Sequence, residues 1–146
     1  MNIFPLTLLM AGASALISIW LGFRVSQMRL RARVSMGDGG NEAMVRRMRT
    51  HANFAEYTPF FLILLGLVEA AIGAQAWLWA VAILFIVARL AHPFGMERPA
   101  PNVLRAGSMV VTWLVLLGLA GYAIAIAYGE IARPKITYAA AGTAAL

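Results

Sequence analysis

The distribution of charged residues divides the chain into long uncharged runs whose lengths suit membrane-spanning helices. Residues 3–23 and residues 106–128 contain no charged side chain, and they are 21 and 23 residues long. A helix that crosses the hydrocarbon core of a bilayer needs about 20 residues at a rise of about 1.5 Å each. Each of these two runs therefore predicts one membrane span.

The central run implies two further spans that extend into the polar sequence on either side of it. Residues 57–88 hold 32 positions with a single charge, Glu69, which is too long for one span and too short for two. Gly73 marks the natural turn, because glycine commonly ends a helix. Two helices that leave this turn each need about 20 residues. The expected spans, within one domain of residues 1–146, are about 3–25, 52–71, 76–95 and 105–128.

These lengths place several polar residues at or inside one membrane boundary, namely Asn53, Glu56, Arg89 and His92. An ionisable group at the bilayer centre costs about 2.5–3.5 kcal/mol on insertion scales. Glu56 is therefore expected to be paired, either with Arg49 through Asn53 or with an arginine of another helix. Glu69 lies near the opposite end of its helix, where its long side chain is expected to reach water.

A polar segment precedes the second span and is expected to extend its helix. Asn41 is a favourable N-cap residue, and Glu42 would lie in the first helical turn. A helix from this point to residue 71 would be about 45 Å long at about 1.5 Å per residue. It would therefore protrude from the membrane.

The composition supports a membrane protein and excludes several classes of function. The chain has 146 residues, of which 62% are hydrophobic and 12% are charged, whereas soluble domains carry about 25% charged residues. Its net charge of +6 indicates membrane flanks rather than a nucleic-acid partner, because the chain is so apolar. The absence of cysteine excludes disulfides, thiolate metal sites and a cysteine nucleophile. Its two histidines lie on separate predicted helices, so no metal site is expected.

The positions of the basic residues predict the orientation in the membrane. Ten of the 12 Lys and Arg residues lie in residues 24–50 and 89–105, and the C-terminal tail holds the other two, Arg133 and Lys135. Because basic residues favour the cytoplasmic side, both long loops are expected in the cytoplasm and both termini outside. Ordinary flanking of the membrane is a sufficient role for Arg24, Arg31, Arg33, Arg46, Arg47 and Arg98.

Polar side chains from all four spans are expected at one membrane level near the cytoplasmic boundary. These residues are Arg29, Arg49, Asn53, Glu56, Arg89, His92 and Arg105. Arg49, Asn53 and Glu56 share one helix face, because their spacings of four and three follow the helical period. Such a pocket would suit a small ligand with carboxylates and one ammonium group, since arginine binds carboxylates through its planar fork. A purely structural network between the helices is the alternative interpretation.

Three short segments carry a resemblance to a known family. Residues 49–59 read RTHANFAEYTP, residues 33–40 read RVSMGDGG and residues 88–95 read ARLAHPFG. The first resembles the RxHxNxxExxP pattern of the MAPEG family, the membrane-associated proteins in eicosanoid and glutathione metabolism. The other two resemble the bacterial inner-membrane branch of that family. The resemblance covers about residues 20–113.

The resemblance implies an all-α, integral membrane four-helix bundle that assembles as a homotrimer in the bacterial inner membrane. It further implies glutathione as a co-substrate, bound between subunits near the cytoplasmic face. The implied binding residues are Arg29, Arg49, Asn53, Glu56 and His92. Glu56 would meet the ammonium group of glutathione, whereas Arg29 and His92 would meet carboxylate or backbone groups. Arg105 would be the catalytic residue that holds the thiolate.

The leading prediction is a glutathione-dependent membrane transferase or peroxidase that acts on a lipophilic electrophile from the bilayer. A free thiol has a pKa of about 8.5, and its thiolate is the nucleophile. Lowering that pKa by two units requires about 2.7 kcal/mol of anion stabilisation, which one desolvated arginine can supply. Met96 and Ala106 stand where the prostaglandin-synthase branch has tyrosine and serine, and Ala52 replaces an arginine, so prostaglandin synthesis is not expected.

Two other classes of protein remain open at this point. Small residues on the first and fourth spans would also suit a non-catalytic membrane scaffold, or a protein that binds lipid or glutathione without turnover. A small multidrug transporter can likewise use a buried glutamate in a four-helix unit. Such a transporter would place its acid near the middle of the membrane, whereas Glu56 is expected at the cytoplasmic boundary.

Overall fold

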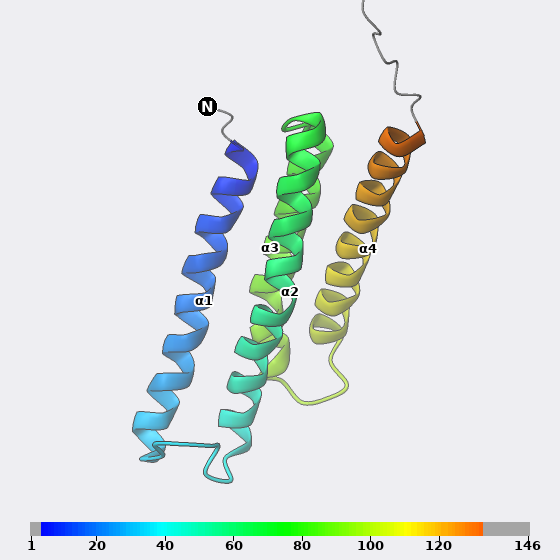
Figure 1. Cartoon of the computed structure of the whole chain (residues 1–146). Helices are drawn as coiled ribbons and strands as arrows, with labels where there is room; N and C mark the ends of the chain where they lie inside the picture. Colours follow the sequence, from blue (N-terminus) through cyan, green and yellow to red (C-terminus); the bar gives the residue numbers. More distant parts are fainter. Residues whose placement is uncertain (1–3, 133–146) are drawn as a thin grey trace, which may run out of the picture.

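Residues 4–132, the part of the chain that the structure describes, fold into four long helices that lie side by side. In this computed structural model the helices are α1 (Pro5–Ala32), α2 (Glu42–Ile72), α3 (Ala76–Met96) and α4 (Val103–Ala132). All four are long and apolar enough to cross a membrane. Figure 1 shows α1 and α4 at opposite edges with α2 and α3 between them, and across the described residues α1 and α4 do not pack together. The prediction of an all-α, four-helix membrane bundle is confirmed.

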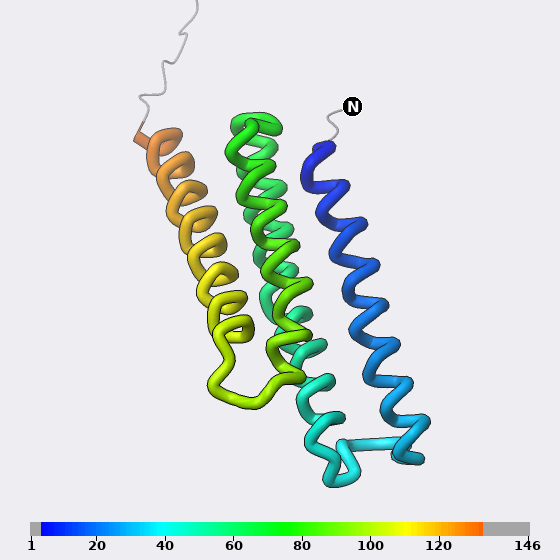
Figure 2. The backbone as a smooth tube through the Cα atoms, turned by 180° about the vertical axis from the view of Figure 1, so that it is seen from behind, coloured from blue at the N-terminus to red at the C-terminus, as the bar shows by residue number. Residues whose placement is uncertain are grey.

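The two ends of the bundle differ in how the helices are connected. Seen from behind in Figure 2, the α1–α2 and α3–α4 connections lie at one end, called here the loop end. The short α2–α3 turn at residues 73–75 lies at the other end, with the start of α1 and the end of α4. The turn is where the sequence predicts it. Arg133 and Lys135 lie outside the described residues, and the side of the membrane that each end faces stays a prediction.

The helices α1 and α2 extend beyond their predicted spans at the loop end (Figure 1). The side-chain oxygen of Asn41 caps α2 by accepting hydrogen bonds from the N–H groups of Ala43 and Met44, at 2.9 and 3.2 Å. The cap and the start of α2 at Glu42 are therefore as predicted, and its protrusion from the membrane stays a prediction. Helix α1 continues to Ala32, seven residues past the predicted span, because a helix satisfies its own backbone outside the membrane as well as inside.

The core of the bundle is apolar and centred between α2 and α3. The rings of Phe61 and Phe85 stack there, with centroids 3.8 Å apart and planes inclined by 6°. Leu6 of α1 and Leu119 of α4 belong to the same buried cluster. Many large apolar side chains also face outward along the helices. This apolar surface is suited to contact with lipid chains. The backbone is suited to it as well, because the helices satisfy their backbone hydrogen bonds internally.

Glu69 corrects one expectation from the sequence. Its side chain does not reach water; the residue is only 3% exposed. Its carboxylate accepts hydrogen bonds from the backbone N–H groups of Leu6 and Thr7, at 3.0 and 2.7 Å. The first turn of a helix has N–H groups without intrahelical partners, and Glu69 satisfies two of those of α1. The start of α1 is therefore fixed to the end of α2.

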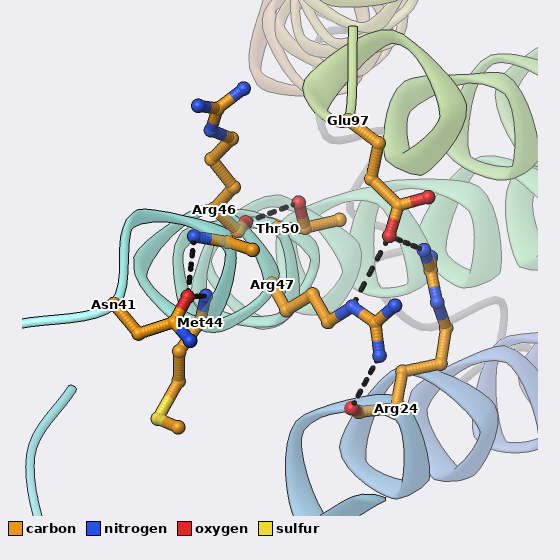
Figure 3. Close-up of polar contacts among 8 residues, drawn as sticks. Arg24, Asn41, Met44, Arg46, Arg47, Thr50 and Glu97 are labelled. Atoms are coloured by element: carbon orange, nitrogen blue, oxygen red, sulfur yellow. Dashed lines mark hydrogen bonds and ion pairs between the residues drawn. The ribbon is translucent and has the colours of Figure 1, made fainter. Parts of the chain in front are cut away.

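At the loop end a second carboxylate connects three helices (Figure 3). Glu97 follows the end of α3 and forms ion pairs with Arg24 of α1 and with Arg47 of α2, whose Nε lies 3.2 Å from the carboxylate. Arg47 also donates a hydrogen bond to the carbonyl oxygen of Arg24, at 3.1 Å. These contacts hold the loop end of the bundle together and set the position of α3 beside α2.

Candidate functional site

A cavity of about 280 Å³ lies between α2, α3 and α4 toward the loop end. Five of the six residues predicted for the site line it, namely Arg49, Asn53, Glu56, His92 and Arg105. Ala52, Met96 and Met109 complete the lining. This volume is close to the lower end of the range for small-molecule pockets, which starts at about 300 Å³. The fold thus brings together predicted site residues that lie up to 56 positions apart in the sequence.

The α2 wall of the cavity carries Arg49, Asn53 and Glu56 on one face. Arg49 and Glu56 are exposed, whereas Asn53 is partly buried. Among residues 4–132, Glu56 forms no ion pair. The pairing expected for Glu56 from the sequence is therefore not found in the described chain. The carboxylate is instead open to the cavity, where it can accept a cationic group.

Arg89 of α3 binds Asn53 from behind the cavity wall. Its Nη1 donates a hydrogen bond to Asn53 Oδ1 at 2.9 Å, and its Nη2 lies 3.5 Å from the sulfur of Met109. Arg89 is only 1% exposed. The sequence places this residue among the polar groups of the expected pocket, but the family resemblance assigns it no contact with the ligand. Its spacing of three from His92 on one helix face is the signal that relates it to the site.

His92 reaches the cavity from α3 and is held by α4. Its Nδ1 lies 2.9 Å from Ser108 Oγ, and Ser108 Oγ donates its hydrogen to the carbonyl oxygen of Arg105 at 2.9 Å. Because a serine hydroxyl has only one hydrogen, we infer that Nδ1–H of His92 is the donor to Ser108. In the neutral ring Nε2 is then a hydrogen-bond acceptor. Ser108 is a supporting residue that the sequence does not indicate.

Arg105 lies in the first turn of α4, close against the end of α3. The side-chain oxygen of Asn102 caps this turn by accepting from the N–H groups of Leu104 and Arg105, at 3.0 and 3.2 Å. Gly95 is buried beside it, and a Cβ atom on Gly95 would lie 2.5 Å from the backbone nitrogen of Arg105. The absence of a side chain at Gly95 therefore allows α4 to bring Arg105 to the cavity.

Arg29 is the predicted site residue that does not line this cavity. It lies in the last turn of α1, where its Nη1 donates to the carbonyl oxygen of Ser35 at 2.8 Å and its Nη2 lies 3.9 Å from the sulfur of Met48. Helix α1 is separated from α4 by the two central helices (Figure 1). The role of Arg29 in ligand binding stays a prediction.

Other polar residues of the loop end have structural partners. Arg46 pairs with Glu42 one helical turn before it, at 2.8 Å. His51 turns away from the cavity toward α1, where its Nε2 lies 3.5 Å from Ser18 Oγ. The cavity itself therefore keeps two arginines, one acid, one amide and one imidazole. This set favours a ligand with more than one anionic group and one cationic group.

The chain is similar to known membrane proteins. The model of the MAPEG family matches residues 7–125, a range that contains every residue lining the cavity. Inner membrane protein YecN of Escherichia coli strain K12 is 34% identical over 110 residues, which are 75% of this chain and 82% of the relative. Inner membrane protein YecN of Escherichia coli O6:H1 strain CFT073 gives the same values.

Proposed function

This chain belongs to the MAPEG family, and from that premise we propose that it is a glutathione-dependent membrane transferase or peroxidase. The observation that carries the proposal is the convergence of Arg49, Asn53, Glu56, His92 and Arg105 on one cavity. The family is broadly associated with glutathione, a tripeptide with two carboxylates and one ammonium group. The charges around the cavity complement those of this ligand.

The proposed roles follow from the chemistry of each side chain. Glu56 has no ion-pair partner among residues 4–132, and it would accept the ammonium group of glutathione. Arg49, Asn53 and His92 would bind carboxylate and peptide groups. Arg105 would stabilise the thiolate, because a guanidinium beside the sulfur favours the anion over the neutral thiol. The long loops would face the cytoplasm. The cavity near them would then be open to cytoplasmic glutathione.

A homotrimer is part of the proposal. Arg105 and Glu56 are both exposed in the single chain, whereas an electrostatic contact gains strength when water is excluded. A neighbouring subunit would cover them, and its α1 would bring Arg29 to the ligand. Exposed apolar residues along α4, such as Leu114 and Leu117, supply a surface for packing against a partner or lipid. Native mass spectrometry in detergent tests the trimer directly.

The second substrate would be a lipophilic electrophile that reaches the thiolate from the bilayer. In a conjugation, the sulfur forms a bond to carbon, a leaving group such as chloride departs, and the thiol proton goes to solvent. In a peroxidase reaction, two glutathione molecules reduce one hydroperoxide, and the products are an alcohol, water and glutathione disulfide. Both reactions need the same activated sulfur.

The deciding experiment combines calorimetry with turnover. We expect glutathione to bind the detergent-solubilised protein with a micromolar-to-millimolar Kd, and the protein to conjugate a chloronitrobenzene or reduce a lipid hydroperoxide. Arg105→Ala should abolish turnover while most of the binding remains. Arg98→Ala is the matched control, because Arg98 is an exposed arginine of the α3–α4 connection that does not line this cavity. No heat of binding at several millimolar glutathione would remove the ligand from the proposal.

Binding without turnover would identify a different function, a glutathione-binding membrane protein without catalytic activity. One observation favours this second candidate. Met96 lines the cavity, and its thioether cannot donate a hydrogen bond to a thiolate, as a hydroxyl would. The turnover assay with both electrophiles separates the two candidates.

A further inference from the structure

The guanidinium of Arg89 is a buried cation without a carboxylate partner in the described part of the chain. Arg89 is 1% exposed, and no ion pair of residues 4–132 includes it. Its Nε has no hydrogen-bond partner there. Arginine remains charged in proteins, so a full positive charge lies behind the wall of the cavity.

The groups around Arg89 compensate this charge only in part. The amide oxygen of Asn53 accepts one hydrogen bond at 2.9 Å, and the sulfur of Met109 is a weak acceptor at 3.5 Å. The rings of Tyr57 and Phe85 each lie 5.9 Å from the guanidinium carbon, within the range of cation–π attraction. An uncompensated buried charge is strongly destabilising, so an anion in the neighbouring cavity would be attracted to this position.

Asn53 connects Arg89 with the cavity. A guanidinium has only donors, so it must face the oxygen of the Asn53 amide. The NH₂ group of Asn53 is then the end left for the cavity, which Asn53 lines. The amide therefore presents donors, and its dipole is aligned by the cation behind it. An acceptor group of the ligand, and best an anionic one, fits in front of it.

We propose that Arg89 is a positioning and specificity-determining residue, which selects an anionic group of the ligand through the amide of Asn53. The inference rests on the proposed function, since glutathione is the ligand tested. The anionic group is either a carboxylate or the thiolate of glutathione. Arg89 acts without touching the ligand, because Asn53 lies between them.

Two substitutions separate the charge of Arg89 from its hydrogen bond. Arg89→Gln removes the charge, while the new amide can still donate to Asn53. We expect the Kd for glutathione to rise at least tenfold in this variant, without a fall in the thermal midpoint. Asn53→Asp places a carboxylate against Arg89. We expect this variant to melt at a higher temperature than the wild type without ligand, and to bind glutathione at least tenfold more weakly.

Controls and a second ligand complete the test. Arg98→Gln removes the same charge from an exposed position outside the cavity, and its Kd should stay within twofold of the wild type. S-methylglutathione cannot form a thiolate. If Arg89→Gln weakens both ligands equally, the anionic group is a carboxylate; if it weakens glutathione alone, the group is the thiolate. Either result supports the proposal.

Other outcomes would overturn the inference, and they differ from those that would overturn the proposed function. An unchanged glutathione Kd in Arg89→Gln, beside clear binding to the wild type, would refute the role of Arg89 alone. If the ligand-free Asn53→Asp protein melts no higher than the wild type, Arg89 is not an unpaired buried cation. This conclusion holds whether or not glutathione binds. If glutathione does not bind the wild type but Asn53→Asp is stabilised, the proposed ligand is refuted. The claim that Arg89 is an unpaired buried cation would then still stand.

Discussion

The carboxylate of Glu69 and the first turn of α1 at Thr7 form one hydrogen-bonded unit. Glu69 Oε2 accepts from the backbone N–H of Thr7 at 2.7 Å and from its hydroxyl at 2.6 Å. Phe4 at the N-cap position of α1 provides no side-chain hydrogen bond. A residue of α2 therefore performs the capping of α1, and its negative charge lies at the positive end of the α1 dipole.

Replacement of this carboxylate should destabilise the bundle. We expect Glu69→Gln to lower the free energy of unfolding by about 2 kcal/mol, because a hydrogen bond to a charged group contributes about 1.5–3 kcal/mol. Thermal unfolding in detergent measures the effect. Glu42→Gln is the control, since the Glu42 side chain is 86% exposed and an exposed ion pair contributes about 1 kcal/mol at most. Equal losses in the two variants would contradict the capping role.

The close approach of Gly95 to Arg105 gives a second prediction. A Cβ atom at Gly95 would lie 2.5 Å from the nitrogen and 2.8 Å from the Cα of Arg105, and backbone atoms cannot yield as a flexible side chain can. We expect Gly95→Ala to displace the start of α4 and to destabilise the protein by about 1–3 kcal/mol. Glutathione binding should weaken with it, since Arg105 lines the cavity.

A glycine with free space around it is the matched control. A Cβ atom on Gly118, in the interior of α4, would meet nothing within 4 Å. Alanine is favoured over glycine inside a helix by about 1 kcal/mol, so Gly118→Ala should leave the melting temperature unchanged or raise it. Changes of the same sign and size in both variants would argue against the close contact.

The helices and one wall of the site could be predicted from the sequence because both depend on local rules. The turn at residues 73–75 follows from the thickness of the bilayer, because each helix that leaves the turn must be long enough to cross it. Arg49, Asn53 and Glu56 share a face in any α-helix, whatever packs against it. The lengths of the predicted spans also place His92 and Arg105 at the same membrane level. Both residues line the cavity.

The partners between helices could not be predicted, because they depend on the rotation and register of one helix against another. Arg89 to Asn53 and His92 to Ser108 are contacts of this kind. Glu69 is expected to reach water from its place near a helix end, and its actual partners are backbone N–H groups 62 and 63 residues away, which no local pattern indicates. The one available signal was at the start of α1, where Phe4, a residue unsuited for capping, stands directly before Pro5.

The open carboxylate of Glu56 predicts a preference for ligands with an ammonium group. We expect Glu56→Gln to weaken glutathione binding about tenfold or more, because a charged hydrogen bond of about 1.5–3 kcal/mol is lost. The des-amino analogue of glutathione lacks this interaction, and its Kd should change less than twofold. Calorimetry with both ligands measures the difference. If the substitution weakens both ligands equally, Glu56 does not meet the ammonium group.

The contact between His92 and Ser108 predicts the protonation pattern of a buried imidazole. With Ser108 donating to the Arg105 carbonyl oxygen, the neutral ring of His92 should carry its proton on Nδ1 and leave Nε2 as an acceptor for the ligand. Nitrogen-15 NMR of labelled histidine in detergent reports this tautomer directly, and the His51 signal is assigned with His51→Asn. A dominant Nε2–H form in the wild type would refute the assignment.

Removal of the Ser108 hydroxyl should release the ring. Ser108→Ala leaves Nδ1–H of His92 buried without its partner, at a cost of about 1–3 kcal/mol, so we expect the tautomer ratio to shift and the glutathione Kd to rise. Thr112→Ala is the matched control, because Thr112 is buried one turn further along α4 and its hydroxyl donates only to the carbonyl oxygen of Ser108. That variant should lose stability while the His92 tautomer stays unchanged. A tautomer shift of equal size in both variants would mean that general loosening of α4, and not the Ser108 hydroxyl, sets the state of the ring.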